Sequence, residues 1–410
     1  MSIKRWVFIC FFNLLIVALL GVIMRYKIAY SLPFIDQKKI LHAHSHFAFA
    51  GWITMVLMVL LVAYLVKQQG DIILKKYKWI LTANLITAYG MLFTFPFQGY
   101  GLYSIIFSTL SIFVSYVFAV MYWRDLNRLS EKKISHLWFK AAVVFNAISS
   151  IGAFSLAAMM ATKSIHQNWY LQAVYFFLHF QYNGWFFFAC MGLFADMLCR
   201  FGVEHKKLKI IFWLFAAACI PAYILSVLWV NISVGAYIIV VLSAFAQVTG
   251  WLIMIKIIYK ARGLIKTFSV TVKWLFLLSA LALSVKLLLQ LGSTIPFLSH
   301  LAFGFRPIVI AYLHLVLLGV ITLFILAYVI YENCVILNKK MYAGIFIFTT
   351  GVFLNELVLM IQGASALNYV NVAYINEILL VVAVIMVSGM YLLTISQRRI
   401  MKEADLNHSL

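Results

Sequence analysis

Apolar runs of about 20 residues recur along the whole chain, and they limit its fold more than any other feature. An α-helix rises about 1.5 Å per residue, so each run is long enough to cross a hydrocarbon core roughly 30 Å thick. Of the 410 residues, 65% are apolar and only 10% are charged. This leaves too little polar surface for a soluble globule of this size. We therefore predict an all-α, polytopic membrane protein that forms a single transmembrane domain over residues 1–410.

The hydropathy pattern predicts about 12 transmembrane helices. They cover residues 5–24, 38–66, 77–96, 101–123, 137–161, 169–199, 209–230, 233–257, 268–291, 304–331, 341–362 and 372–396. The first run has a basic start, but no small-residue cleavage site follows it, so we expect a helix rather than a signal peptide. Pro221 is expected to kink the seventh span.

Lysines and arginines cluster at every second boundary between spans, beginning with Lys4 and Arg5 and ending with Arg398, Arg399 and Lys402. This pattern predicts that both termini are cytoplasmic, in a multi-pass protein of a bacterial-type cytoplasmic membrane surrounded by lipid. The net charge of +21 is distributed over these short clusters and forms no continuous face, which argues against nucleic-acid binding. The five cysteines are scattered without a CxxC pair, so neither a disulfide framework nor a zinc site is expected.

The second span begins with LHAHSHFAFAGW, which carries His42, His44 and His46 into an apolar run. Polar side chains at membrane depth are normally paired or functional, and histidine is a frequent ligand of metals and heme iron. His42 and His46 are four residues apart and share a helix face, whereas His44 points to nearly the opposite side. At most two of the three histidines can therefore contribute to one ligand-binding site.

Two other histidines lie within predicted spans. His179 and His314 are each about ten residues into a span that enters from the outer side, roughly 15 Å deep. Three helices thus bring imidazoles to comparable depth, which favours a shared metal or heme over separate hydrogen bonds within the bundle. The other histidines are expected to be solvated; these are His136, His166, His205, His300 and His408.

A few further polar residues occur in the outer half of the spans, notably Lys286 and Gln290 in the ninth and Glu356 in the eleventh. Lys286 and Glu356 could form an ion pair, a proton relay or a structural contact. The aromatic stretch FFLHFQYNGWFFF around His179 could enclose a flat macrocycle, or it could belong to an aromatic belt facing lipid.

The number of predicted spans, the positions of the histidines among them and several motifs resemble the heme-copper oxidase superfamily. This superfamily includes cytochrome c oxidase subunit I and the large subunit of nitric oxide reductase. In the second span, a histidine followed by an aromatic run and glycine is similar to the family's low-spin heme segment. In the tenth, YLHLVL (residues 312–317) resembles the family's HFHYVL pattern. In the sixth, HFQYNG (residues 179–184) resembles HLWVEG of nitric oxide reductase.

The resemblance implies a low-spin b-type heme held by His314 and a second-span histidine, His42 first and His46 next. It places Tyr312 where the family has its high-spin heme ligand, and His179 on a ligand of the second, non-heme metal. The family's His-His pair for that metal is missing from the seventh span. The resemblance therefore implies at least one bis-histidine heme beside a degraded catalytic centre, with a second heme, copper or iron as a weaker expectation.

Two main classes of function follow from these residues, and a third, a membrane non-heme metalloenzyme, would need a denser cluster of histidines and carboxylates than the spans contain. As an oxidoreductase-like cytochrome, the chain would transfer electrons or sense heme or a gas, with a small redox subunit or a quinone or cytochrome donor as partner. As a transporter or channel, it would use the same histidines as transient sites for a metal ion or a proton. A reduced-minus-oxidised spectrum would separate the two classes.

Overall fold

The computed structural model describes residues 2–164, 166–265, 267–298 and 306–398. Within these ranges every regular element is a helix and none is a strand. Ten of the described helices are long and apolar enough to cross a membrane. The expectation of a polytopic helical membrane protein is thereby confirmed.

The ten helices coincide with ten of the 12 predicted spans. They are Ile3–Ala29, Gln37–Gln69, Ile72–Gln98, Leu102–Arg128, Ile134–Ala161, Val234–Lys260, Val270–Gly292, Arg306–Tyr331, Lys339–Leu367 and Ile375–Ser396. The predicted sixth span is helical from Gln167 to Arg200, but His179, Gln181 and Asn183 lower its hydropathy. The predicted seventh is the 15-residue helix α9 (His205–Cys219), which gives way to a 3₁₀ turn, η3 (Pro221–Ser226), because proline cannot continue the backbone ladder.

The chain divides into two compact units. Unit 1 comprises residues 1–118 and 325–410, and unit 2 comprises residues 119–324. The elements of unit 1 are α1 (Ile3–Ala29), α2 (Gln37–His46), η1 (Phe47–Thr54), α3 (Met55–Gln69), α4 (Ile72–Gln98), the first part of α5 (Leu102–Arg128), most of α15 (Leu323–Tyr331), α16 (Lys339–Leu367) and α17 (Ile375–Ser396).

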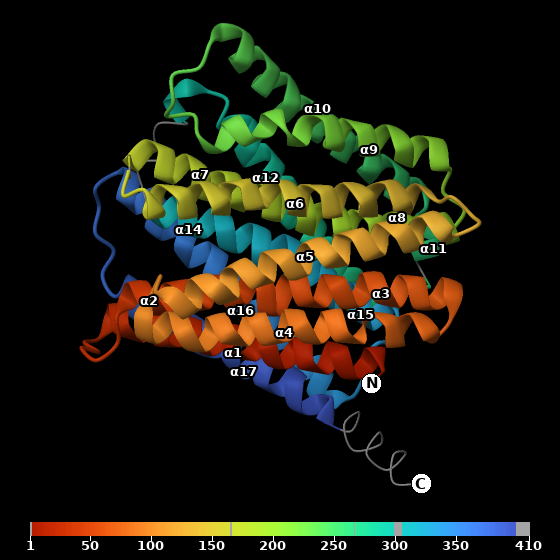
Figure 1. Cartoon of the computed structure of the whole chain (residues 1–410), viewed down its shortest axis with the longest axis horizontal. Helices are drawn as coiled ribbons and strands as arrows, with labels where there is room; N and C mark the ends of the chain where they lie inside the picture. The colour runs from red at the N-terminus through yellow and green to blue at the C-terminus, as the bar shows by residue number, and fades with distance from the viewer. Residues whose placement is uncertain (1, 165, 266, 299–305, 399–410) are drawn as a thin grey trace. The chain divides into compact units, whose positions relative to one another are not determined.

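In unit 1, α17 packs against both α1 and α16. Helix α4 packs along α2 and α3 (Figure 1). Glycines allow α16 and α17 to approach closely. A Cβ at Gly389 would lie 2.5 Å from the backbone nitrogen of Phe348, and one at Gly344 would lie 2.8 Å from that of Leu393. Small residues commonly permit such backbone contact between membrane helices.

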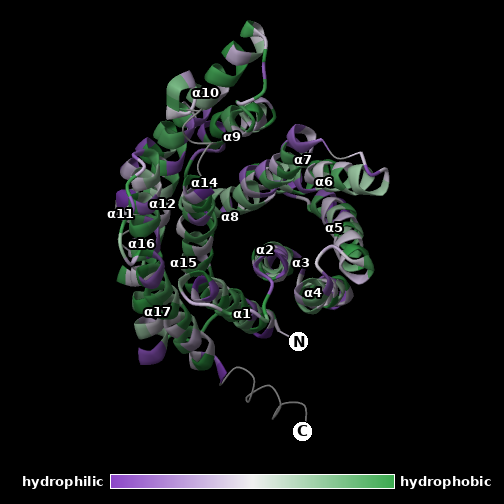
Figure 2. Cartoon of the chain, turned by 90° about the vertical axis from the view of Figure 1, so that its left-hand side faces the viewer, coloured by the Kyte–Doolittle hydropathy of each residue, from purple (hydrophilic) through white to green (hydrophobic). Residues whose placement is uncertain are grey.

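Unit 2 is built mainly around α6. Its elements are the end of α5, α6 (Ile134–Ala161), α7 (Gln167–His179), η2 (Phe180–Phe186), α8 (Phe187–Arg200), α9, η3, α10 (Val234–Lys260), α11 (Arg262–Ile265), α12 (Val270–Gly292), α14 (Arg306–His314) and η4 (Leu315–Thr322). Helix α6 packs against α7, η2 and α8, while α12 packs against α10 and η4. The long helices are coloured largely as hydrophobic in Figure 2, whereas α2 is coloured largely as hydrophilic.

Candidate histidine sites

A π-helical segment begins immediately after three histidines of the predicted spans. η1 follows His46, η2 follows His179 and η4 follows His314. A π-helix has one more residue per hydrogen-bonded ring than an α-helix, and such segments occur frequently at functional sites. The same local break therefore accompanies each of the three helices that were singled out by their histidines.

Polar side chains from neighbouring helices satisfy backbone carbonyls of these segments. In unit 1, Asn13 donates to the carbonyl of Gly51 at 2.6 Å, and Asn84 donates to that of Ala50 at 3.2 Å. In unit 2, the Ser279 hydroxyl donates to the carbonyl of Val320 at 2.7 Å. Carbonyls in a π-register are thus hydrogen-bonded rather than left exposed in an apolar core.

Sequence reasoning missed these segments, although a signal was present. Glycine stands five residues after the histidine in all three helices, as Gly51, Gly184 and Gly319. A Cβ would lie 2.6 Å from the Phe47 ring at Gly51, and equally close to the Cβ of Phe145 at Gly184. The recurrent His-x4-Gly spacing marks a wide helical turn in which little space remains beside the glycine.

In unit 1, His42 and His46 share one face of α2, as predicted, and meet aromatic side chains. His46 stacks on Phe95 with ring centroids 4.4 Å apart, and its Nε2 lies 3.2 Å from the hydroxyl of Tyr100. His42 lies edge-on to Tyr100 at 4.6 Å, and its buried Nε2 has no hydrogen-bond partner among the described residues. A buried imidazole nitrogen without a partner fits a site for an additional ligand.

His44 faces a different helix. Its Nδ1 lies 3.1 Å from the carbonyl of Val17 on α1, and a Cβ at Gly21 would lie 3.7 Å from its ring. The prediction that His44 points away from His42 and His46 is confirmed.

In unit 2, the ring of His314 is oriented by its own helix. Its Nδ1 donates a hydrogen bond to the carbonyl of Ile310, one turn earlier, at 2.8 Å. This bond fixes the proton on Nδ1 and the lone pair on Nε2. Metal-bound histidines are typically oriented in this way, through a hydrogen bond from the nitrogen that does not bind the metal.

His179 is also in unit 2, fully buried, and both of its ring nitrogens are used within the protein. Nε2 donates to the carbonyl of Cys219 at 2.8 Å, and Nδ1 accepts from the side-chain amide of Asn183 at 3.1 Å. Metal binding by His179 stays a prediction, and it would require the bond to Asn183 to break.

Tyr312 lies on α14, beside Tyr182 of η2, with ring centroids 6.1 Å apart. Tyr182 in turn lies 6.4 Å from the ring of His179. These contacts bring Tyr312 toward the site of His179, and its role as a heme ligand stays a prediction.

One of the histidines expected to be solvated is buried. His136 is only 4% exposed, because it lies in the first turn of α6 and its Nδ1 accepts from the backbone N–H of Lys133, completing an N-terminal cap. The exposure predicted for His166 and His205 is confirmed. His300, His408, Arg399 and Lys402 lie outside the described residues.

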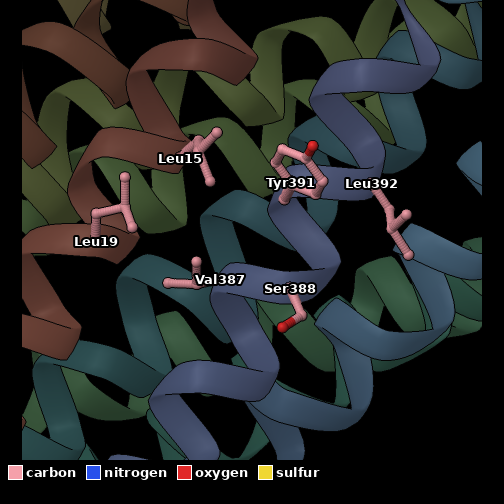
Figure 3. Close-up of a pocket in the computed structure, with 6 residues that line it drawn as sticks. All are labelled: Leu15, Leu19, Val387, Ser388, Tyr391 and Leu392. Atoms are coloured by element: carbon pink, nitrogen blue, oxygen red, sulfur yellow. The ribbon is translucent and has the colours of Figure 1, made fainter.

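The described residues contain no group of three or more His, Cys, Asp or Glu side chains that could hold a metal ion. A groove of about 460 Å³ lies between α1 and α17 in unit 1 (Figure 3). It is lined by Leu15, Leu19, Val387, Ser388, Tyr391 and Leu392. Since no imidazole, carboxylate or thiol lines this groove, it is not part of the histidine sites.

In comparisons with known proteins, no family model and no curated protein matches the chain.

Proposed function

We propose that the chain is a heme-binding, multi-pass membrane protein in which His314 and a second-span histidine ligate a b-type heme. The observation that carries this proposal is the π-helical segment that begins directly after His46 and His314. The hydrogen bond from Nδ1 to the carbonyl of Ile310 orients the His314 ring and places its lone pair on Nε2. The π-helical segment and this bond together give an oriented imidazole in an apolar helix. Such an imidazole is suited to an axial position on heme iron.

Within the second span, we favour His42 as the ligand and place His46 next. The Nε2 of His42 is buried without a hydrogen-bond partner among the described residues, whereas the Nε2 of His46 already meets the Tyr100 hydroxyl. Ligation through His42 would therefore satisfy an unpaired nitrogen without breaking a bond. His42 and His314 belong to different units, and the argument for each residue rests on its own surroundings.

A heme with two imidazole ligands has no open iron position, so it would carry or sense an electron. The residues of this chain would hold and orient it, with Phe95 and Tyr100 providing an aromatic wall beside His42 and His46. The proposal implies an electron-transfer partner, a small redox subunit or a quinone or cytochrome donor. It also implies residence in a bacterial-type cytoplasmic membrane. A second heme, copper or iron near His179 and Tyr312 is a weaker part of the same proposal.

The test is the reduced-minus-oxidised absorption spectrum of the purified full chain, expressed with ample heme. We expect the signal of a low-spin b-type heme. A colourless protein that is otherwise folded would overturn the proposal. Saturable transport of zinc or copper by that colourless protein in vesicles would favour the transporter instead.

A further inference from the structure

Lys286 is a buried lysine in α12 of unit 2, two turns before the helix ends at Gly292. The residue is only 5% exposed, and its ammonium has no hydrogen bond or ion pair with a described residue of unit 2. An ammonium that is removed from water without a partner is strongly disfavoured. The amine is therefore neutral unless an anionic group compensates its charge.

Unit 2 has no carboxylate left to compensate this charge. Residues 119–324 contain four acidic side chains, and each is paired with a basic residue elsewhere in the unit. The pairs are Asp125 with Arg128, Glu131 with Lys133, Asp196 with Arg200 and Glu204 with Lys207.

Gln290 lies one helical turn beyond Lys286 on the same face of α12. It is 7% exposed, and its side-chain oxygen is buried without a hydrogen-bond partner among the described residues. Side chains four residues apart on a helix are neighbours, with Cβ atoms roughly 5–6 Å apart. One face of α12 thus combines a lysine without a carboxylate partner in unit 2 with a hydrogen-bond acceptor that has no partner among the described residues.

Within the described part of unit 2, no carboxylate forms an ion pair with the Lys286 side chain. The face of α12 that carries Lys286 packs on η4, where the Ser279 hydroxyl bonds the carbonyl of Val320. In the same unit, His179 and Cys219 are held in hydrogen bonds of their own. A metal cation at this position would be repelled by the ammonium, so an anionic ligand is favoured.

We propose that Lys286 and Gln290 form a binding site for a small carboxylate that carries an adjacent hydroxyl group, such as a 2-hydroxy acid. The carboxylate would pair with the ammonium of Lys286. The neighbouring hydroxyl would donate to the side-chain oxygen of Gln290. This site is independent of the heme proposal, since neither residue is a heme ligand in it.

The test is equilibrium dialysis of the full chain in lipid nanodiscs against labelled glycolate and labelled acetate at constant ionic strength. We expect saturable binding of both, with glycolate bound about 5- to 10-fold more tightly because only glycolate offers a hydroxyl donor. Gln290→Leu should remove this preference and leave the affinity for acetate unchanged. Lys286→Met should abolish saturable binding of both acids.

Lys256→Met is the matched control, because it removes the same charge from an exposed position of α10 in the same unit. It should leave both affinities unchanged. Folding of each variant is monitored by circular dichroism and gel filtration. If Lys286→Met does not fold, the wild-type titration and the Gln290→Leu variant decide the question.

Two results would overturn the proposal. One is the absence of saturable binding of either acid by the wild-type chain at millimolar concentrations. The other is the appearance of acetate binding only after Glu356→Gln, which would show that a carboxylate of the chain itself compensates Lys286.

Discussion

The surroundings of His46 and His179 share a local break in the helix but differ in how the imidazole is satisfied. Both histidines directly precede a π-helical segment, and both have glycine five residues later. His179 uses both ring nitrogens in hydrogen bonds within unit 2. In unit 1, by contrast, the neighbouring His42 keeps a buried nitrogen without a partner among the described residues. The break alone therefore does not make a ligand site.

The three histidines that precede π-helical segments also differ in the residue four positions later. After His179 it is Asn183, whose amide reaches back to Nδ1, whereas after His46 it is Ala50 and after His314 it is Leu318. Alanine and leucine side chains have no hydrogen-bond donor, so neither can act on its histidine as Asn183 acts on His179. An amide at this position turns a candidate ligand into a structural histidine.

The largest expected effect is the loss of heme when a ligand is removed. His314→Ala and His42→Ala should each abolish the low-spin b-type signal, a larger loss than the about 10- to 100-fold change in metal affinity typical of outer-shell substitutions. The measurement is the heme-to-protein ratio of the purified variants. His44→Ala is the control, because His44 faces α1, and it should retain the heme.

His179→Ala should instead leave the heme signal in place while lowering stability. Retention of the full signal after His314→Ala, or its loss after His179→Ala, would reverse the assignment of the two histidines.

The next largest expected effect is a loss of stability when a hydrogen bond of His179 is removed. Asn183→Ala leaves the buried Nδ1 of His179 without its donor, which should reduce the free energy of unfolding by about 1–3 kcal/mol. Thermal unfolding of the full chain in nanodiscs measures the change. An unchanged midpoint for Asn183→Ala would show that the bond does not contribute.

Alanine substitutions at the glycines of the π-helical segments should reduce stability by different amounts. A Cβ at Gly51 would lie 2.6 Å from the fully buried Phe47 ring, while one at Gly319 would lie 3.1 Å from the Cβ of Ala282. Gly51→Ala should therefore destabilise the chain by about 1–3 kcal/mol, as expected for overpacking, and Gly319→Ala by less. Equal unfolding midpoints for the two variants would contradict this ranking.

Much of the fold follows from the apolar runs, because a membrane-spanning helix depends mainly on length and composition. The orientation of His44 was also predictable from helical periodicity alone. The hydrogen bonding of both His179 ring nitrogens could not be predicted, because one partner is the backbone carbonyl of Cys219, 40 residues away in the sequence. The π-helical segments were missed because hydropathy is insensitive to one extra residue per turn. In the sequence these segments are indicated only by a glycine five residues after the histidine, a pattern that occurs in three separate spans.

The smallest effect concerns the start of α2, which carries His42 and His46. The exposed carboxylate of Asp36 caps this helix by accepting from the backbone N–H groups of Lys38 and Lys39 at 2.8 and 3.0 Å. Those bonds hold the pKa of Asp36 below its usual value of 3.8. A carboxyl group with a depressed pKa stabilises the folded state above its unfolded pKa, and this contribution is lost as the pH falls through the folded value.

We therefore expect faster amide exchange at Lys38 and Lys39 in Asp36→Ala at neutral pH, with Asp36→Asn close to wild type because asparagine caps helices equally well. Acidification below pH 3.8 should reduce the difference between wild type and Asp36→Ala. Exchange rates that do not distinguish Asp36→Ala from Asp36→Asn would show that the cap does not hold this turn. The heme signal should persist in both variants, because the cap lies more than one turn before His42 and acts only on the helix end.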